Sequence, residues 1–236
     1  MLIGDSHAAQ WYPALEPIAR RLGSRLVTFT KGACPIADVA GSGPRAEEDS
    51  CVAWRAAVLR QVMDMRPALV ITANFAHVKW PGDKGGRYLV DDWGAAYHRA
   101  LVALDSAGIE TVVLRNPPRP GFDVPACVAR LERFQRANPP LCEFDRGLPR
   151  VVEVARQEEL AARGLRSVTL VDLSHRICPE TRCAPVLDGR LVYRDRHHLT
   201  VSFVQSLTEE LYALLRPFPE SATPEETARE ARTAGL

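Results

Sequence analysis

The sequence lacks several features that would assign the chain to a class at once. Its 236 residues contain no apolar run of about 18 residues, so we expect no segment that crosses a bilayer as a helix. The first residues, Met1–Gly4, lack the basic and apolar parts of a signal peptide. The net charge of +1 gives no long-range attraction to nucleic acid or to an anionic membrane. No internal repeat is visible.

The overall amino-acid composition is typical of a soluble domain. Hydrophobic residues make up 46% and charged residues 25% of the chain, which is long enough for one sizeable buried core. We expect a domain over 1–216 with a Pro-rich, cysteine-bearing insertion at 117–148, and a partly ordered tail at 217–236. Because a serine motif begins at the fourth residue, directly after a very short strand, we also expect the chain to be a piece of a longer protein.

Cysteine is the most informative residue type. The chain has six cysteines, and none of them forms the C-x-x-C pair typical of zinc sites, so we predict no metal centre. Short loop closure favours disulfides between sequence neighbours, although other pairings are possible. Disulfides indicate an oxidising compartment outside the cytoplasm, and the alternative is a cytosolic enzyme with reduced cysteines. The favoured pairs are Cys34 with Cys51, Cys127 with Cys142, and Cys178 with Cys183.

Strand and helix patterns alternate along the chain. Short apolar runs indicate strands, and longer amphipathic segments indicate helices. Strands buried on both faces and separated by helices predict a parallel, doubly wound sheet in a three-layer α/β/α sandwich of flavodoxin-like type. The first expected strand ends at Ile3, and the others span 26–30, 68–72, 111–114 and 168–171. The expected helices span 8–22, 52–65, 91–107, 151–163 and 199–215.

The first candidate functional motif is Gly4-Asp5-Ser6-His7, which follows a strand and precedes a helix. Ligands of doubly wound sheets bind at the carboxyl ends of the strands, so a serine placed there presents its hydroxyl to the binding crevice. The helix N-terminus that follows favours developing negative charge. The alternative is that Asp5 or Ser6 only caps the helix.

A second motif, Asp195-Arg196-His197-His198, precedes the last predicted helix. Asp195 and His198 are three residues apart, which places them on one face if the segment forms a helical turn. A serine nucleophile needs an imidazole base that a carboxylate orients, and this pair supplies both. His197 has the wrong offset from Asp195 and is expected to point elsewhere. The alternative is a pair of solvated histidines before a helix.

Together these residues resemble the SGNH, or GDSL-like, hydrolase superfamily. More narrowly, they resemble the C-terminal extracytoplasmic SGNH domain of bacterial acyltransferase-3 membrane O-acyltransferases. The resemblance covers residues 2–216 and depends on Gly-Asp-Ser-His-Ala at 4–8, Lys-Gly-Ala-Cys-Pro at 31–35 and Tyr-Arg-Asp-Arg-His-His-Leu-Thr at 193–200. It implies that Ser6 is the nucleophile, His198 the general base and Asp195 its orienting acid.

The resemblance also implies an oxyanion hole. Its donors would be the backbone N–H groups of Ser6 and Gly32 and the side chain of Asn74. The sequence departs from the superfamily here, because Thr72-Ala73 precede Asn74 where the usual pattern is Gly-x-Asn-Asp. The alternative for Gly32 is a turn glycine, and the alternative for Asn74 is a strand-end cap. Three further residues, for which structural or solvated roles are the alternative, are candidates for substrate binding: His7, His77 and Trp80.

The expected function follows from this resemblance. A membrane acyltransferase domain would deliver an acyl donor, and an acyl-Ser6 intermediate would pass the acetyl or other short-chain group to a hydroxyl of a cell-envelope glycan or glycolipid. No cofactor, metal or nucleic acid is expected. The domain would lie in the periplasm or on the outer face of the plasma membrane, tethered through a membrane domain. The alternatives are a stand-alone secreted carbohydrate O-acyl esterase and a non-catalytic glycan-binding module.

Overall fold

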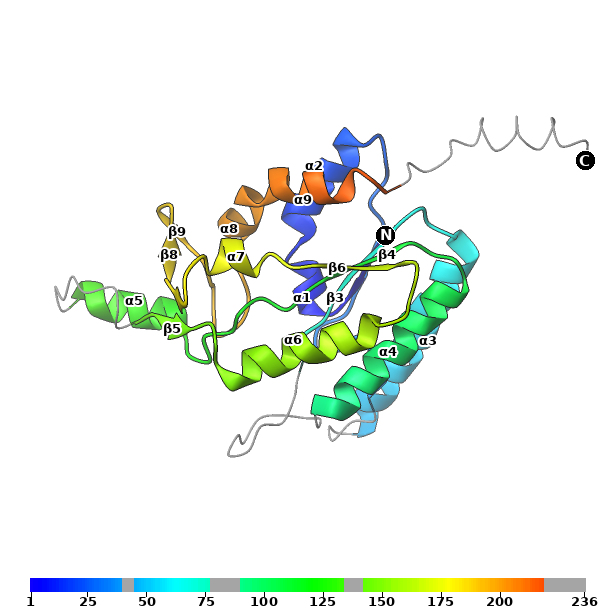
Figure 1. Ribbon diagram of the computed structural model, residues 1–236, viewed down its shortest axis with the longest axis horizontal. Coiled ribbons are helices and arrows are strands. Elements are labelled where there is room, and N and C mark those ends of the chain that lie inside the picture. The colour runs from blue at the N-terminus through cyan, green and yellow to red at the C-terminus, as the bar shows by residue number, and fades with distance from the viewer. Residues whose placement is uncertain (40–44, 77–89, 134–141, 219–236) are drawn as a thin grey trace, which may run out of the picture.

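The computed structural model describes residues 1–39, 45–76, 90–133 and 142–218, which form an α/β sandwich around a parallel sheet (Figure 1). Five strands pair in the order β2-β1-β3-β4-β6, and every pairing is parallel. This confirms the predicted fold class. The strands are β1 (Leu2–Gly4), β2 (Thr28–Thr30), β3 (Val70–Ala73), β4 (Thr111–Leu114) and β6 (Val168–Val171).

Helices cover both faces of the sheet, as Figure 1 shows. Alternate strand residues point to opposite faces, so Leu2 packs in one core with Trp11 and Leu211, whereas Ile3 packs in the other with Trp93. The first core is covered by α1 (Ser6–Ala9), α2 (Tyr12–Arg21), α8 (Val201–Ser206) and α9 (Thr208–Leu215). The second is covered by α3 (Arg45–Met65), α4 (Val90–Ser106) and α6 (Pro149–Ala162).

Smaller elements lie outside the central sheet, and the sequence patterns did not predict them. They include two antiparallel pairs of short strands. One of these pairs, β5–β7, joins residues of the predicted 117–148 insertion to the segment that contains Cys183. These elements are α5 (Val124–Arg133), β5 (Phe144–Asp145), α7 (Ser174–Ile177), β7 (Arg182–Cys183), β8 (Val186–Leu187) and β9 (Arg190–Leu191).

Two predicted helices are each divided in two. The helix expected over 8–22 is interrupted between α1 and α2, because Pro13 has no N–H to donate and its ring would clash with the carbonyl of Ala9. The helix expected over 199–215 is interrupted at Leu207, where the hydroxyls of Ser206 and Thr208 donate to the carbonyls of Phe203 and Gln205. Helix α3 begins at Arg45 rather than at residue 52.

The cysteines form the three sequence-neighbour pairs that loop closure favoured: Cys34–Cys51, Cys127–Cys142 and Cys178–Cys183. The first disulfide ties the loop after β2 to α3. Within the described ranges, no helix combines the length and the apolar character that a membrane span requires. Residues 219–236 of the predicted tail lie outside the described part of the chain.

Gly4, the last residue of β1, offers a test of this packing. Its φ is +141°, and a Cβ added there would lie 2.2 Å from the carbonyl oxygen of Ala73 and 2.9 Å from Cβ of Ala8. We therefore expect Gly4→Ala to lower the free energy of unfolding by at least about 2 kcal/mol. Urea unfolding measures this change. Gly32→Ala is the matched control, because a Cβ there meets nothing within 4 Å, and we expect a change within about 0.5 kcal/mol. Equal stability of the two variants would contradict this account.

Candidate active site

The turn between β1 and α1 carries the first candidate, Ser6. The buried carboxylate of Asp5 accepts the backbone N–H of His7 at 2.8 Å with one oxygen and that of Phe75 at 2.7 Å with the other. Burial raises the pKa of Asp5 to about 6, despite the opposing effect of these N–H donors. Asp5 therefore caps α1 and also fixes the turn that carries Ser6 against the residues that follow β3.

Residues 193–199 form a tight loop that carries the other two candidates. Tyr193 and Leu199 pair across it, and the N–H of Arg194 donates to the carbonyl of His198 at 2.9 Å. Asp195 Oδ1 accepts the backbone N–H groups of His197 and His198 at 2.8 and 2.7 Å. The expected helical turn is therefore wrong: a side-chain-capped loop brings Asp195 and His198 together, and the helix begins later, with Thr200 as its N-cap.

The two motifs meet in one continuous chain of hydrogen bonds. Ser6 Oγ lies 2.8 Å from His198 Nε2, and His198 Nδ1 lies 2.7 Å from Asp195 Oδ2. Burial of Asp195 opposes its ionisation, but hydrogen bonds from the His198 and His197 N–H groups and from the His198 ring outweigh it and lower its pKa to about 2. An ionised carboxylate, an imidazole and a hydroxyl are thus aligned in the order that serine activation requires.

Neighbouring elements hold this loop at both ends. Leu199 donates its N–H to Gln10 Oε1 at 2.9 Å, directly after α1. The buried hydroxyl of Tyr193 donates to the carbonyl of Pro118, in the segment after β4. The loop 193–199 is therefore tied to the end of α1 on one side and to the start of the predicted insertion on the other.

The oxyanion-hole candidates lie at the carboxyl ends of neighbouring strands. Ser6 is the first residue of α1, so its N–H has no partner within that helix. Gly32 occupies an exposed turn after β2, and its N–H makes no hydrogen bond to any described residue. Asn74, directly after β3, is buried: its Oδ1 accepts the N–H of Ile36 at 2.8 Å and its Nδ2 donates to Thr72 Oγ1 at 3.0 Å. One N–H of the Asn74 amide group remains beyond that bond.

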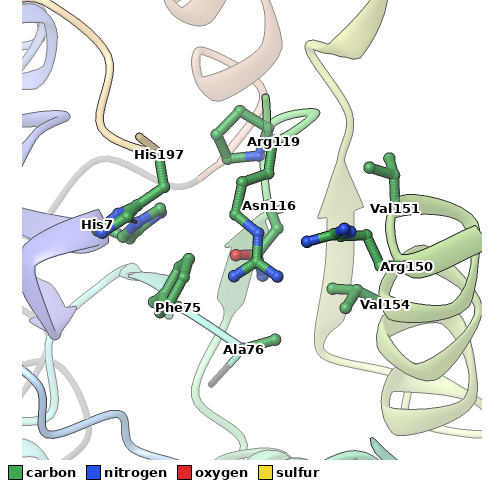
Figure 2. Close-up of a pocket in the computed structure, with 10 residues that line it drawn as sticks. His7, Phe75, Ala76, Asn116, Arg119, Arg150, Val151, Val154 and His197 are labelled. Atoms are coloured by element: carbon green, nitrogen blue, oxygen red, sulfur yellow. Dashed lines mark hydrogen bonds between the residues drawn. The ribbon is translucent and has the colours of Figure 1, made fainter. Parts of the chain in front are cut away.

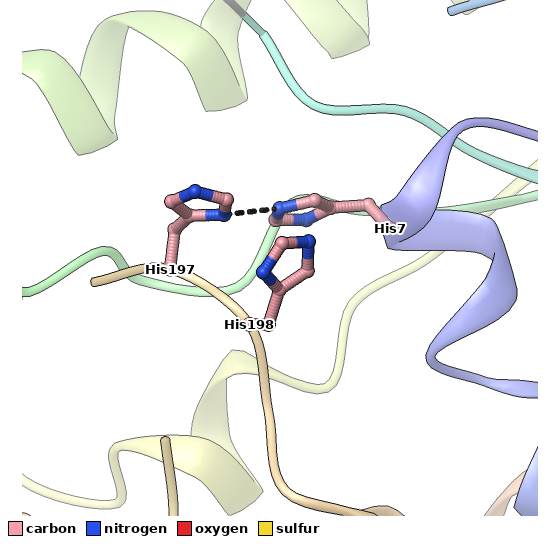
Figure 3. Close-up of side chains that lie close together, drawn as sticks. All are labelled: His7, His197 and His198. Carbon is pink, nitrogen blue, oxygen red and sulfur yellow. Dashed lines mark hydrogen bonds between the residues drawn. The ribbon is translucent and has the colours of Figure 1, made fainter. Parts of the chain in front are cut away.

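The imidazoles of His7, His197 and His198 lie close together, as Figure 3 shows. His197 Nδ1 and His7 Nε2 lie 3.0 Å apart, and Phe75 stacks on His197 with ring centroids separated by 4.4 Å. As expected, His197 does not face Asp195 with its ring. Ring nitrogens of His7, His197 and His198 lie within 4.8 Å of one another, a spacing that a metal ion could bridge. Both nitrogens of His198 are already hydrogen-bonded, so a cation held by all three rings would break its bond to Ser6 or to Asp195.

A pocket opens next to these rings (Figure 2). His7 and His197 line one side, which places His7, one of the three predicted substrate-binding residues, at the pocket. The other two, His77 and Trp80, lie outside the described residues. The sequence patterns did not predict the remaining lining residues, which come from the segments after β3 and β4 and from the first turns of α6: Phe75, Ala76, Asn116, Pro117, Arg119, Arg150, Val151 and Val154.

Comparison with known families places this geometry in context. The family model of the SGNH domain (fused to AT3 domains) matches residues 1–213. The chain belongs to this family. The membership agrees with the resemblance of the sequence motifs. The matched residues include the sheet, the turn that carries Ser6 and the loop 193–199. A search of curated proteins found no match.

Solved structures share the fold. The lipopolysaccharide acetyltransferase periplasmic domain of Salmonella ser. Paratyphi A superposes with a TM-score of 0.68 at 16% identity, over 91% of this chain and 82% of that chain. The acetyl xylan esterase AlAXEase superposes with a TM-score of 0.53 at 12% identity, over 90% of this chain and 98% of that chain. At these identities the likeness shows a common fold.

The half-buried position of His197 leads to a prediction about pH. Burial, with further contributions from neighbouring charges, lowers its pKa from 6.5 to about 4. Between these two values the unfolded chain binds a proton at His197 that the folded chain does not bind, so stability falls as the pH decreases through this window. In His197→Gln this contribution is absent.

Urea unfolding of both proteins at a series of pH values measures the effect. We expect the stability advantage of the wild type over His197→Gln to decrease as the pH falls from 6.5 to 4, and to be constant above that window. An advantage that stays the same across the window would contradict the assignment of His197 as a neutral, half-buried imidazole.

Proposed function

We propose that this domain transfers an acyl group through Ser6 to a hydroxyl of a cell-envelope glycan or glycolipid. The observation that carries the proposal is the hydrogen-bonded series Ser6–His198–Asp195, found in a chain of the SGNH family fused to AT3 domains. The matching fold of a lipopolysaccharide acetyltransferase periplasmic domain supports an acetyl or similar short-chain group.

In the first half-reaction, Ser6 Oγ attacks the carbonyl carbon of the acyl donor while His198 Nε2 accepts the hydroxyl proton. The carboxylate of Asp195 orients the ring through Nδ1 and stabilises the imidazolium that forms. When the tetrahedral intermediate collapses, the bond between the carbonyl carbon and the leaving group breaks. The leaving group takes the proton from His198, and acyl-Ser6 remains.

In the second half-reaction, an acceptor hydroxyl replaces the leaving group. His198 removes its proton, the acceptor oxygen attacks the acyl carbon, and the bond to Ser6 Oγ breaks as Oγ regains a proton. Water can act as the acceptor when no glycan is bound. The isolated domain is therefore expected to hydrolyse activated esters.

Negative charge develops on the carbonyl oxygen in both steps. The N–H groups of Ser6 and Gly32 and the side chain of Asn74 are the proposed donors to it. The N–H of Gly32, which makes no hydrogen bond within the described part of the chain, supports this assignment, and so does the fixed orientation that Ile36 and Thr72 impose on Asn74.

The proposed setting is extracytoplasmic. Three disulfides favour an oxidising compartment. The fusion of family members to AT3 domains supports a membrane acyltransferase as the source of the acyl donor. A catalytic domain over 1–216 and a tail over 217–236 remain our proposed division of the chain.

The nucleophile assignment has a direct test. We expect purified protein to hydrolyse an aryl acetate and to react with a fluorophosphonate at Ser6, as peptide mass spectrometry would locate. Ser6→Ala should abolish the labelling and lower kcat by about 10³-fold or more. Asp195→Asn should retain Ser6 but lower kcat by about 10⁴-fold, because the ring of His198 loses the partner that fixes its tautomer.

Ser202→Ala serves as the matched serine control, since Ser202 is exposed on α8 and we expect its activity to equal that of the wild type. Labelling at a serine other than Ser6, or full activity in Ser6→Ala, would refute the proposed mechanism. If Ser6 is the labelled residue, the intact mass of the wild type after incubation with candidate donors identifies the acyl group that it carries.

A further inference from the structure

The pocket beside the proposed catalytic groups has an unusual balance of charge. Its walls include two arginines, two histidines and one asparagine, together with apolar side chains. No acidic side chain lines it among the residues that the structure describes. The nearby buried carboxylate of Glu158 is turned to other groups: it accepts both the N–H and the side-chain amide of Asn116, and it pairs with Arg115.

Arg150 supplies the first cation. It is half-buried in the first turn of α6, and its Nη1 reaches the loop after β4, 3.6 Å from the place that a Cβ at Gly121 would occupy. No ion pair or hydrogen bond joins its guanidinium to any described residue. The positive end of the α6 dipole lies in the same wall, because Arg150, Val151 and Val154 line the pocket from the start of that helix.

Arg119 supplies the second cation from the opposite side. Its Cζ lies 4.9 Å from the ring centroid of Phe75, the ring that also stacks on His197. Figure 2 shows the guanidinium groups of Arg119 and Arg150 directed into the same space beside Asn116. The charge of Arg119 also contributes to the lowered pKa of His197, which places it in the electrostatic environment of the histidine cluster.

Partly desolvated guanidinium groups that converge from two elements match a planar carboxylate or a phosphate, which accept paired N–H donors. A neutral sugar hydroxyl would bring no negative charge to these guanidinium groups. The pocket adjoins the reacting groups, since its His7 and His197 are the direct sequence neighbours of Ser6 and His198.

We propose that this pocket binds an anionic substituent, a carboxylate or a phosphate, of the glycan whose hydroxyl is acylated at Ser6. The proposal rests on the proposed function and specifies its substrate class: an acidic rather than a neutral glycan. Arg150 and Arg119 are the residues that select it.

Competitive inhibition of aryl acetate hydrolysis tests this selection without knowledge of the acylated position. The probes are glucuronate with its uncharged methyl ester, and glucose 6-phosphate with glucose. For the wild type we expect at least one charged sugar to have an inhibition constant about 10-fold or more below that of its uncharged counterpart. The charged sugar with the lower inhibition constant shows whether the pocket prefers a carboxylate or a phosphate.

In Arg150→Gln the ratio between the uncharged and charged inhibition constants should fall toward 1, and in Arg150→Lys it should lie between those of Gln and the wild type. Because each ratio is taken within one protein, a loss of active enzyme does not alter it. Arg25→Gln is the matched control: Arg25 is exposed before β2, at the strand ends opposite the site, and its ratio should equal that of the wild type.

Equal inhibition by charged and uncharged sugars in the wild type would overturn the proposal, and so would an unchanged ratio in Arg150→Gln. The proposed function and the proposed anion selectivity of the pocket can fail independently. If the wild type does not hydrolyse aryl acetate, the proposed function fails, and calorimetric titration with the same four sugars still decides whether the pocket binds anions through Arg150.

Discussion

The site depends on one buried carboxylate, that of Asp5. Its two oxygens accept N–H groups from chain segments that are 68 residues apart, at His7 and at Phe75. Removal of the carboxylate would leave two buried donors unpaired, at a cost of about 1–3 kcal/mol each. Asp5 thereby fixes three things together: the direction of Ser6, the position of Asn74 beside Phe75, and the aromatic surface on which His7 and His197 stack.

The sequence predicted the layered fold, and it singled out three candidate residues that the structure brings within hydrogen-bond distance of one another. Strands β4 and β6 have the predicted bounds, because each is a continuous apolar run with a clear stop on either side. Ser6 could be proposed because it follows a strand end, and Asp195 and His198 because an aspartate three residues before a histidine supplies the carboxylate and imidazole that serine activation requires. The helical turn proposed for Asp195 and His198 was wrong, yet the spacing was informative, since an aspartate that caps its own loop also brings residues three apart together.

Other features arise from tertiary contacts and have no local pattern. Arg150 stands at the start of an amphipathic helix and resembles any solvated residue in the sequence; only the packing of α6 against the loop after β4 turns it toward Arg119. The pairing of His7 with His197 likewise joins residues 190 positions apart. The divisions of two predicted helices depend on Pro13 and on the hydroxyls beside Leu207, whose effects apolar periodicity does not register.

The hydrogen bond from Tyr193 to Pro118 has an evolutionary consequence. It joins the loop that holds the base to the segment that presents Asn116 and Arg119 to the pocket. A change of this segment that alters the pocket also displaces the partner of Tyr193. If the proposed function holds, substrate preference and turnover are epistatic in this domain: effects of substitutions at 116–119 then depend on the residues at 193–199, and the two segments are expected to diverge together.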